Sequence, residues 1–130
     1  MDVGNECRPL YWVGSSHEDL KEFPDQVWDI IGHALNIAQW GGKSPKAKLL
    51  KNIGSGVIEV VADYNGDTYR AVYIVRLASG IYVLHCFQKK SKHGIKTPQK
   101  EIDLIKQRLN EAIEQDREAQ RSKDHEYHKK

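Results

Sequence analysis

Groups that could hold and cleave a polyanion are gathered in one stretch of this sequence. Between Ile81 and Lys100 there are five Lys, two His and no carboxylate. Lysine cations attract phosphate groups, and histidine can exchange protons near neutral pH. An apolar run that ends at Phe87 leads directly into this cluster. The stretch therefore indicates polyanion binding and supplies groups for proton chemistry on the bound molecule.

The net charge of +2 conceals a strong asymmetry along the chain. Residues 1–40 carry two basic and seven acidic side chains, whereas residues 41–100 carry eleven basic and three acidic ones. Residues 101–130 are nearly balanced. A cationic middle section flanked by acidic or neutral segments favours a nucleic acid or an acidic protein as the partner over a membrane surface.

Length and composition predict a single domain over residues 1–118, followed by a disordered tail over residues 119–130. The chain has no run of 18 apolar residues and no pattern typical of a signal peptide, so we expect a cytoplasmic protein with no membrane partner. Cys7 and Cys86 lack a metal-binding spacing, and we expect reduced thiols. No motif calls for a metal or another cofactor.

Hydrophobic periodicity predicts an α+β fold with an antiparallel sheet of about four strands, two N-terminal helices and one C-terminal helix. Asn65-Gly66 is a strong hairpin signal, and Pro24 and Thr97-Pro98 mark helix starts. A basic connector over residues 43–52 joins the second helix to the sheet. We expect strands over 8–13, 57–63, 68–77 and 81–88, and helices over 16–23, 24–40 and 97–118.

Alternation along the strands predicts which side chains share a face. If Ser79-Gly80 forms a two-residue hairpin loop, Arg70 lies opposite Lys89. One face then carries the polar set and the other carries a core set. The polar set is Arg70, Arg76, His85, Phe87 and Lys89, and the core set is Tyr73, Val75, Leu84 and Cys86.

The polar set has two interpretations that the residues alone leave open. It could form a cationic face that binds phosphates through Arg70 and Arg76 and stacks a base on Phe87. It could equally be an ordinary amphipathic sheet with solvated cations, in which His85 is a packed strand residue. Glu59 and Asp63 lie in an otherwise apolar strand and do not suggest paired catalytic carboxylates. Gly41-Gly42-Lys43-Ser44 lacks the first glycine of a P-loop.

Three runs of this sequence resemble one known family. They are Tyr69 to Tyr73, Gly80 to Lys90, and Thr97 to Ile102. The chain is similar over roughly residues 25–115 to the phage-derived, HigB-like toxins. These toxins belong to the RelE/ParE superfamily of type II toxin–antitoxin systems.

The resemblance implies a ribosome-dependent endoribonuclease that cleaves mRNA without a metal. In the implied reaction the RNA 2′-OH attacks the adjacent phosphate and leaves a 2′,3′-cyclic phosphate. Arg70 would bind the scissile phosphate. Lys92 and His93 would transfer protons or contact rRNA, with His85 as an alternative. The catalytic candidates implied in this way are Arg70, Lys89, Lys90, His93 and His85. The candidates for contacts with RNA and the ribosome are Lys43, Lys46, Lys48, Lys51, Arg76, Phe87, Lys92 and Lys96.

The resemblance also implies partners and leaves alternatives for the function. A cognate antitoxin, expected to be a helix-turn-helix protein, would hold the toxin inactive, and the ribosome and mRNA would be its targets. Some members of the superfamily inhibit DNA gyrase instead of cleaving RNA. The alternatives are therefore a non-enzymatic inhibitor of this kind and a module that only binds nucleic acid.

Overall fold

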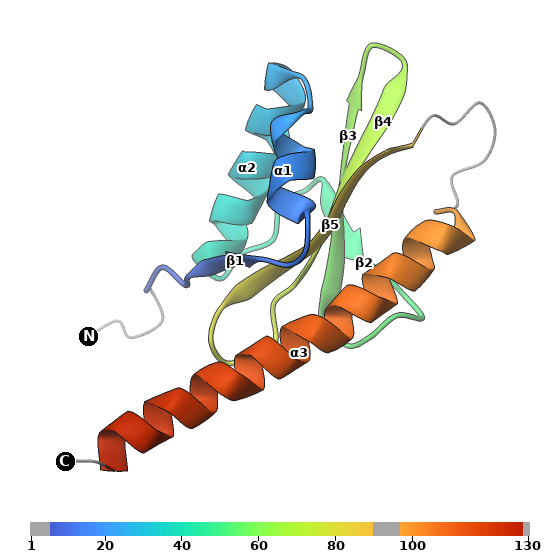
Figure 1. The fold of residues 1–130 in the computed structure, drawn as a ribbon. Coiled ribbons are helices and arrows are strands. Elements are labelled where there is room, and N and C mark those ends of the chain that lie inside the picture. The colour runs from blue at the N-terminus through green and yellow to red at the C-terminus, as the bar shows by residue number, and fades with distance from the viewer. Residues whose placement is uncertain (1–5, 90–96, 129–130) are drawn as a thin grey trace.

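The fold is built on a five-stranded mixed sheet with the strand order β1-β5-β4-β3-β2. The computed structural model describes residues 6–89 and 97–128, with side chains as far as Lys123. Helices cover both faces of the sheet (Figure 1). The strands are β1 (Leu10–Trp12), β2 (Ala47–Leu49), β3 (Val57–Tyr64), β4 (Asp67–Ile74) and β5 (Ile81–Lys89), and the helices are α1 (Ser16–Lys21), α2 (Asp25–Gln39) and α3 (Gln99–His128).

The β3–β4 hairpin confirms the prediction made from Asn65-Gly66. Tyr64 pairs with Asp67, which leaves Asn65 and Gly66 as a two-residue loop. Both loop residues have positive φ, 56° and 85°. This is the backbone conformation of a type I′ turn, in which Asn-Gly is favoured.

The predicted register between β4 and β5 is wrong. Arg70 pairs with Phe87 and Val72 with His85, and the register shifts after Val72 so that Tyr73 pairs with Val83. Leu84 is the extra residue of this β-bulge, and it packs on the same face as Val72 instead of with Cys86. The connection between the strands runs from residue 75 to residue 80 and is not a two-residue loop.

Distant groups hold this longer connection in place. The Arg8 guanidinium donates to the carbonyl oxygens of Val75, Leu77 and Gly80. The Asp116 carboxylate accepts from the backbone N–H groups of Ala78 and Ser79, at 3.2 and 2.7 Å. Because these groups satisfy the loop backbone, the chain leaves the sheet at Ile74 and Arg76 lies outside it.

Two edge strands correct the prediction of an antiparallel sheet of about four strands. β1 pairs with β5 in the parallel direction, with Leu10 opposite Ile81. β2 pairs antiparallel with β3 inside the segment that we expected to be a basic connector. Its exposed Lys48 is typical of an edge strand, where charge discourages pairing with other chains. Because this edge strand is exposed and charged, its sequence resembles that of a solvated loop.

Helices α1 and α2 pack on one face of the sheet. The apolar stripe of α2 is fully buried at Val27, Ile31 and Ala34 and contacts the side chains of β3, β4 and β5 that face it. α2 ends in a Schellman motif, in which Gly42 N–H donates to Ile37 O and Gly41, at φ 92°, donates to Ala38 O. The predicted helix over residues 24–40 is thus confirmed within one residue at each end.

Helix α3 packs diagonally across the opposite face (Figure 1). Ile105, Leu109 and Ala112 are buried against Val57, Val72, Ile74, Leu84 and Phe87 of the sheet. The carbonyl of Pro98 accepts the first helical hydrogen bonds, from Glu101 N and Ile102 N. The predicted capping residue Thr97 instead directs its hydroxyl to Glu59 Oε2, at 3.4 Å.

The structure continues α3 to His128, beyond the helix end expected near Glu118. Ion pairs at i,i+3 spacing, Arg117–Glu114 and Arg121–Glu118, support the exposed turns. Gln120 donates to the Ser79 hydroxyl at 3.1 Å, which ties this part of α3 to the β4–β5 connection. Such tertiary support is not visible in a polar sequence. None of the helices in the described ranges is long and apolar enough to cross a membrane.

Replacing Ile105 with Ala should destabilise the protein, because Ile105 is fully buried between α3 and the sheet. The expected loss in the free energy of unfolding is about 2–5 kcal/mol, measured by urea denaturation at neutral pH. Lys106→Ala is the matched control on the exposed side of the same turn and should change it by less than about 0.5 kcal/mol. Equal effects of the two substitutions would contradict the packing of α3 on the sheet.

Candidate functional site

The predicted strand arginine is part of a buried ion pair. Arg70 Nη1 donates to Glu59 Oε1 at 2.9 Å, and the side chains are 7% and 1% exposed. The β3–β4 hairpin places Val61 directly opposite Arg70, so Glu59 lies two residues along β3 on the same face. Glu59 was missed as a site residue because it stands in an apolar strand. The signal that could have found it is the register fixed by the Asn65-Gly66 turn.

The structure does not present the predicted polar set as an open cationic face. Arg70, His85, Phe87 and Lys89 are all buried, at 6 to 8% exposure. The open cationic face, one of the two interpretations that the sequence left open, is wrong because α3 covers this face of the sheet. The grouping of the four side chains on one face is nevertheless correct, because strand parity survives the change in register.

A pocket of about 570 Å³ opens beside Arg70, at the end of the sheet near the start of α3. It brings together three cationic side chains predicted from the sequence, Lys48, Lys51 and Arg70, and we call it the cationic pocket. Lys48 and Lys51 are exposed at its rim, and Arg70 is buried in it. Its lining is completed by Leu49, Leu50, Glu59, Thr97, Gln99 and Ile102.

Lys89 ends β5, opposite Thr68 of β4. Its pKa is lowered from the usual 10.5, first by burial and then by the charge of Arg70, with Glu59 acting in the opposite direction. Because the charges of Arg70 and Glu59 both affect its pKa, Lys89 lies close enough to interact with this ion pair. A lysine with a lowered pKa gives up its proton more readily than an exposed lysine does, which suits proton donation to a leaving group.

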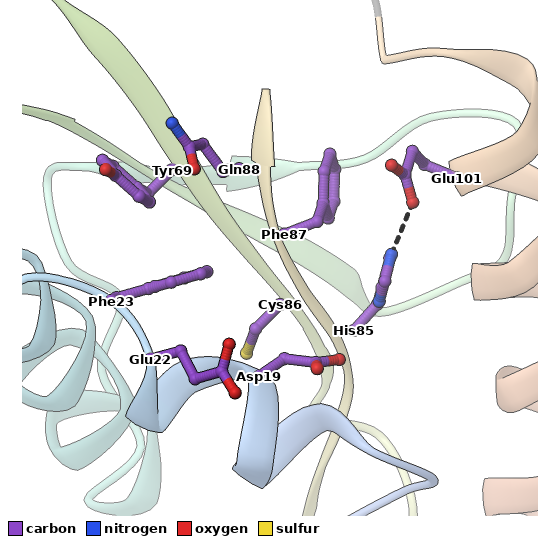
Figure 2. A pocket seen from close by; sticks show the side chains of 9 residues that line it. All are labelled: Asp19, Glu22, Phe23, Tyr69, His85, Cys86, Phe87, Gln88 and Glu101. Atoms are coloured by element: carbon purple, nitrogen blue, oxygen red, sulfur yellow. Dashed lines mark hydrogen bonds and ion pairs between the residues drawn. The ribbon is translucent and has the colours of Figure 1, made fainter. Parts of the chain in front are cut away.

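His85 lies in a second pocket, of about 360 Å³, on the other side of Phe87. Figure 2 shows its ring directed at Glu101. Nε2 is 2.7 Å from Glu101 Oε1, and Nδ1 is 3.3 Å from Arg108 Nη1. Arg108 can only donate, so Nδ1 accepts, and Nε2–H donates to the carboxylate. This arrangement fits a neutral imidazole and agrees with a lowered His85 pKa, for which burial is the largest cause.

The charged residues that line the His85 pocket are mainly acidic, whereas those that line the cationic pocket are mainly basic. Asp19, Glu22 and Glu101 reach it from α1 and α3, and Phe23, Tyr69 and Phe87 form aromatic walls (Figure 2). The ring of His85 stacks on that of Phe87 at 4.7 Å between centroids. His85 therefore ties β5 to α3 and stands apart from Arg70, although the sequence analysis grouped the two as catalytic candidates.

The remaining candidates fall outside these pockets or outside the described residues. Arg76 is exposed and donates to Ser55 O at 2.7 Å, away from the cationic pocket. Lys43 and Lys46 are exposed near β2 and do not line it. The structural description does not extend to Lys90, Lys92, His93 and Lys96.

Two observations on the part of the chain that the structure describes concern metal ligands and the thiol of Cys86. Within it, no group of three or more His, Cys, Asp and Glu side chains is arranged to hold a metal ion. Burial raises the pKa of Cys86 to about 12, so this thiol stays protonated and is a poor nucleophile.

The His85 arrangement predicts a pH dependence of stability. A His pKa below its usual 6.5 in the folded state means that the unfolded chain binds the proton more readily. The free energy of unfolding should therefore fall as the pH drops below about 6.5, down to the folded pKa. Urea denaturation at pH 7.5 and 5.5 should show this loss in the wild type and in a His33→Gln control, and a smaller loss in His85→Gln. An unchanged loss in His85→Gln would contradict the assignment of a neutral buried imidazole.

The chain and its fold can now be compared with known proteins. A search of curated proteins gives no match. The toxin–antitoxin complex RelBE2 from Mycobacterium tuberculosis is similar over 67% of this chain and 99% of that chain, at 15% identity and a TM-score of 0.39, too low for inference. The family model described as "Phage derived protein Gp49-like (DUF891)" matches residues 18–110, a range that includes all lining residues of both pockets. The chain therefore belongs to the Gp49-like family of phage-derived proteins.

Proposed function

We propose that this protein is the toxin of a type II toxin–antitoxin system and that it cleaves mRNA on the ribosome as a metal-independent endoribonuclease. The observation that carries the proposal is the cationic pocket, in which Lys48, Lys51 and Arg70 converge beside Glu59. The resemblance of the strand and Thr-Pro runs to the HigB-like toxins supports the same function. The cognate partner would be an antitoxin, and the targets would be the ribosome and mRNA.

The pocket can bind RNA through its phosphates. Lys48 and Lys51 at the rim attract the backbone, and Arg70 inside the pocket neutralises the charge that develops on the scissile phosphate. The ion pair with Glu59 fixes the position of the guanidinium. Because the Arg70 guanidinium is held in place before RNA arrives, little reorganisation of this group accompanies the reaction.

The reaction is a transesterification whose protons and bonds balance without a metal. The RNA 2′-oxygen forms a bond to phosphorus, and the bond from phosphorus to the 5′-oxygen breaks. Glu59 is the carboxylate that lines this pocket, and it takes the 2′-OH proton. Lys89, whose pKa is lowered, supplies a proton to the leaving 5′-oxygen. His85 acts at a distance by fastening α3, whose Gln99 and Ile102 line the pocket.

One observation favours a second candidate, nucleic-acid binding without cleavage. Arg70 is already neutralised by Glu59 in the structure, and such a pair can serve binding without chemistry. A toxin of this kind would arrest growth with intact transcripts, and a gyrase-directed inhibitor would also leave DNA breaks. Cleaved transcripts without DNA damage would exclude both alternatives.

The double variant Lys48→Ala/Lys51→Ala should lose toxicity and stay folded, because both side chains are exposed. Each lost charge-assisted contact to phosphate weakens RNA binding by roughly tenfold or more. Growth after induced expression measures the effect, with circular dichroism as the check on folding. Lys100→Ala/Lys106→Ala removes the same charge from exposed positions on α3 outside the pocket. Arrest that is equally strong in both double variants would rule out the cationic pocket as the site.

The ion pair can be tested without leaving a buried charge. Arg70→Ala alone leaves the buried Glu59 carboxylate without the cation of its ion pair and should destabilise the protein by about 3–5 kcal/mol. The double variant Glu59→Gln/Arg70→Gln removes both charges, so its melting temperature should lie much closer to that of the wild type. We expect this folded double variant to be non-toxic. Full toxicity in it would show that neither side chain takes part in the activity.

A further inference from the structure

Helix α2 presents an outward face that nothing in the core of the protein uses. Its residues follow one another at three- and four-residue spacing, so they lie along one side of the helix. Two tryptophans on or beside this side are well exposed, Trp28 at 39% and Trp40 at 51%. The outer α2 face consists of Asp25, Trp28, Asp29, Gly32, Asn36 and Trp40.

Gly32 lies in the middle of this face, and no neighbouring side chain in the described chain requires a glycine there. A Cβ atom built at Gly32 would meet no other atom within 4 Å, and its backbone is not in the positive-φ region. Glycine is a poorer helix former than alanine because it loses more backbone entropy. Glycine at such a position lets another backbone approach the helix closely.

The charge on this face indicates the chemistry of that partner. α2 carries Asp25 and Asp29 and has no Lys or Arg. A pocket of about 400 Å³ is lined by Asp25, Trp28 and Asp29 of α2 together with Lys21 of α1, so carboxylates outnumber cations in it by two to one. An aromatic surface rimmed by carboxylates is complementary to a segment that carries apolar and cationic side chains together.

We propose that the outer α2 face is the docking surface for a basic amphipathic helix of a partner protein. The partner helix crosses α2 at Gly32, packs apolar side chains on Trp28 and Trp40, and places its cations at Asp25 and Asp29. Under the proposed function, on which this identification rests, the partner is the antitoxin. α2 covers the opposite face of the sheet from the cationic pocket, so docking leaves that pocket open.

Binding of a defined peptide tests this surface. The probe is a fluorescently labelled 15-residue helical peptide of Leu and Lys, compared with the same peptide bearing Glu in place of Lys. We expect the Lys peptide to bind the full chain at about 0.15 M salt, where distant charges are screened, and the Glu peptide to bind much more weakly. Fluorescence anisotropy gives the dissociation constants. Equal binding of the two peptides, or no binding of the Lys peptide, overturns the proposal.

Variants locate the binding. Gly32→Gln fills the crossing point and should weaken the Lys peptide on the order of tenfold, without lowering the melting temperature. Asp25→Asn/Asp29→Asn should weaken it several-fold. Glu111→Gln/Glu114→Gln, which removes the same charge from the exposed side of α3, should leave binding unchanged. Binding that is equal in Gly32→Gln and the wild type, or equally weakened by the α3 control, overturns the proposal.

Two further measurements separate this inference from its alternatives. Sedimentation of the protein alone should give a monomer, whereas a dimer dissociated by Gly32→Gln would identify a second copy of the chain as the occupant and overturn the proposal. The Lys48→Ala/Lys51→Ala variant should bind the peptide as the wild type does. Since the peptide assay involves neither RNA nor toxicity, failure of the proposed function would leave its result intact.

Discussion

The docking of α3 on the sheet determines the rest of this structure. Its apolar residues cover the face that carries the cationic strand residues, and its first turn completes the wall of the cationic pocket. Polar anchors at several points distribute the attachment along the helix. They are Glu101 and Arg108 at His85 and Asp116 at the β4–β5 connection. Without α3 the sheet would expose an open cationic surface. With α3 in place, Arg70, His85 and Lys89 are buried, and the exposed cations of the cationic pocket are Lys48 and Lys51 at the edge of the sheet near β2.

The burial of Arg70 with Glu59 has an energetic meaning. A buried ion pair loses the solvation of both charges, and its mutual attraction roughly offsets that loss, so such a pair is weak evidence for stability. An apolar pair at the same positions would serve the fold equally well. Under the proposed function, a pair at the inner end of a pocket with Lys48 and Lys51 at its rim serves to bind an anion. His85 differs from Arg70, because its partners are Glu101 and Arg108 of α3. It stabilises the attachment of α3 to the sheet.

Local sequence signals predicted the local elements well. Asn65-Gly66 specified the β3–β4 hairpin, because the turn type needs residues that tolerate positive φ, and the apolar stripe of α2 specified a helix and its buried side. Contacts between distant residues decided what the sequence could not predict. Arg8 and Asp116 hold the long β4–β5 connection, which changes the register of Arg70 and Lys89. The pairing of Glu59 with Arg70 follows from hairpin register and not from composition, so the acidic member of the site escaped notice.

Primer extension on mRNA from a reconstituted translation reaction tests the central claim most directly. The reaction is run with no toxin, with the wild-type protein, and with the Lys48→Ala/Lys51→Ala variant. We predict discrete new 5′ ends that appear only with the wild-type protein and only when ribosomes are translating. Intact mRNA in the presence of a wild-type protein that arrests growth would contradict cleavage and leave the cationic pocket as a binding site. New ends of equal strength with the Lys48→Ala/Lys51→Ala variant would place the activity elsewhere in the molecule.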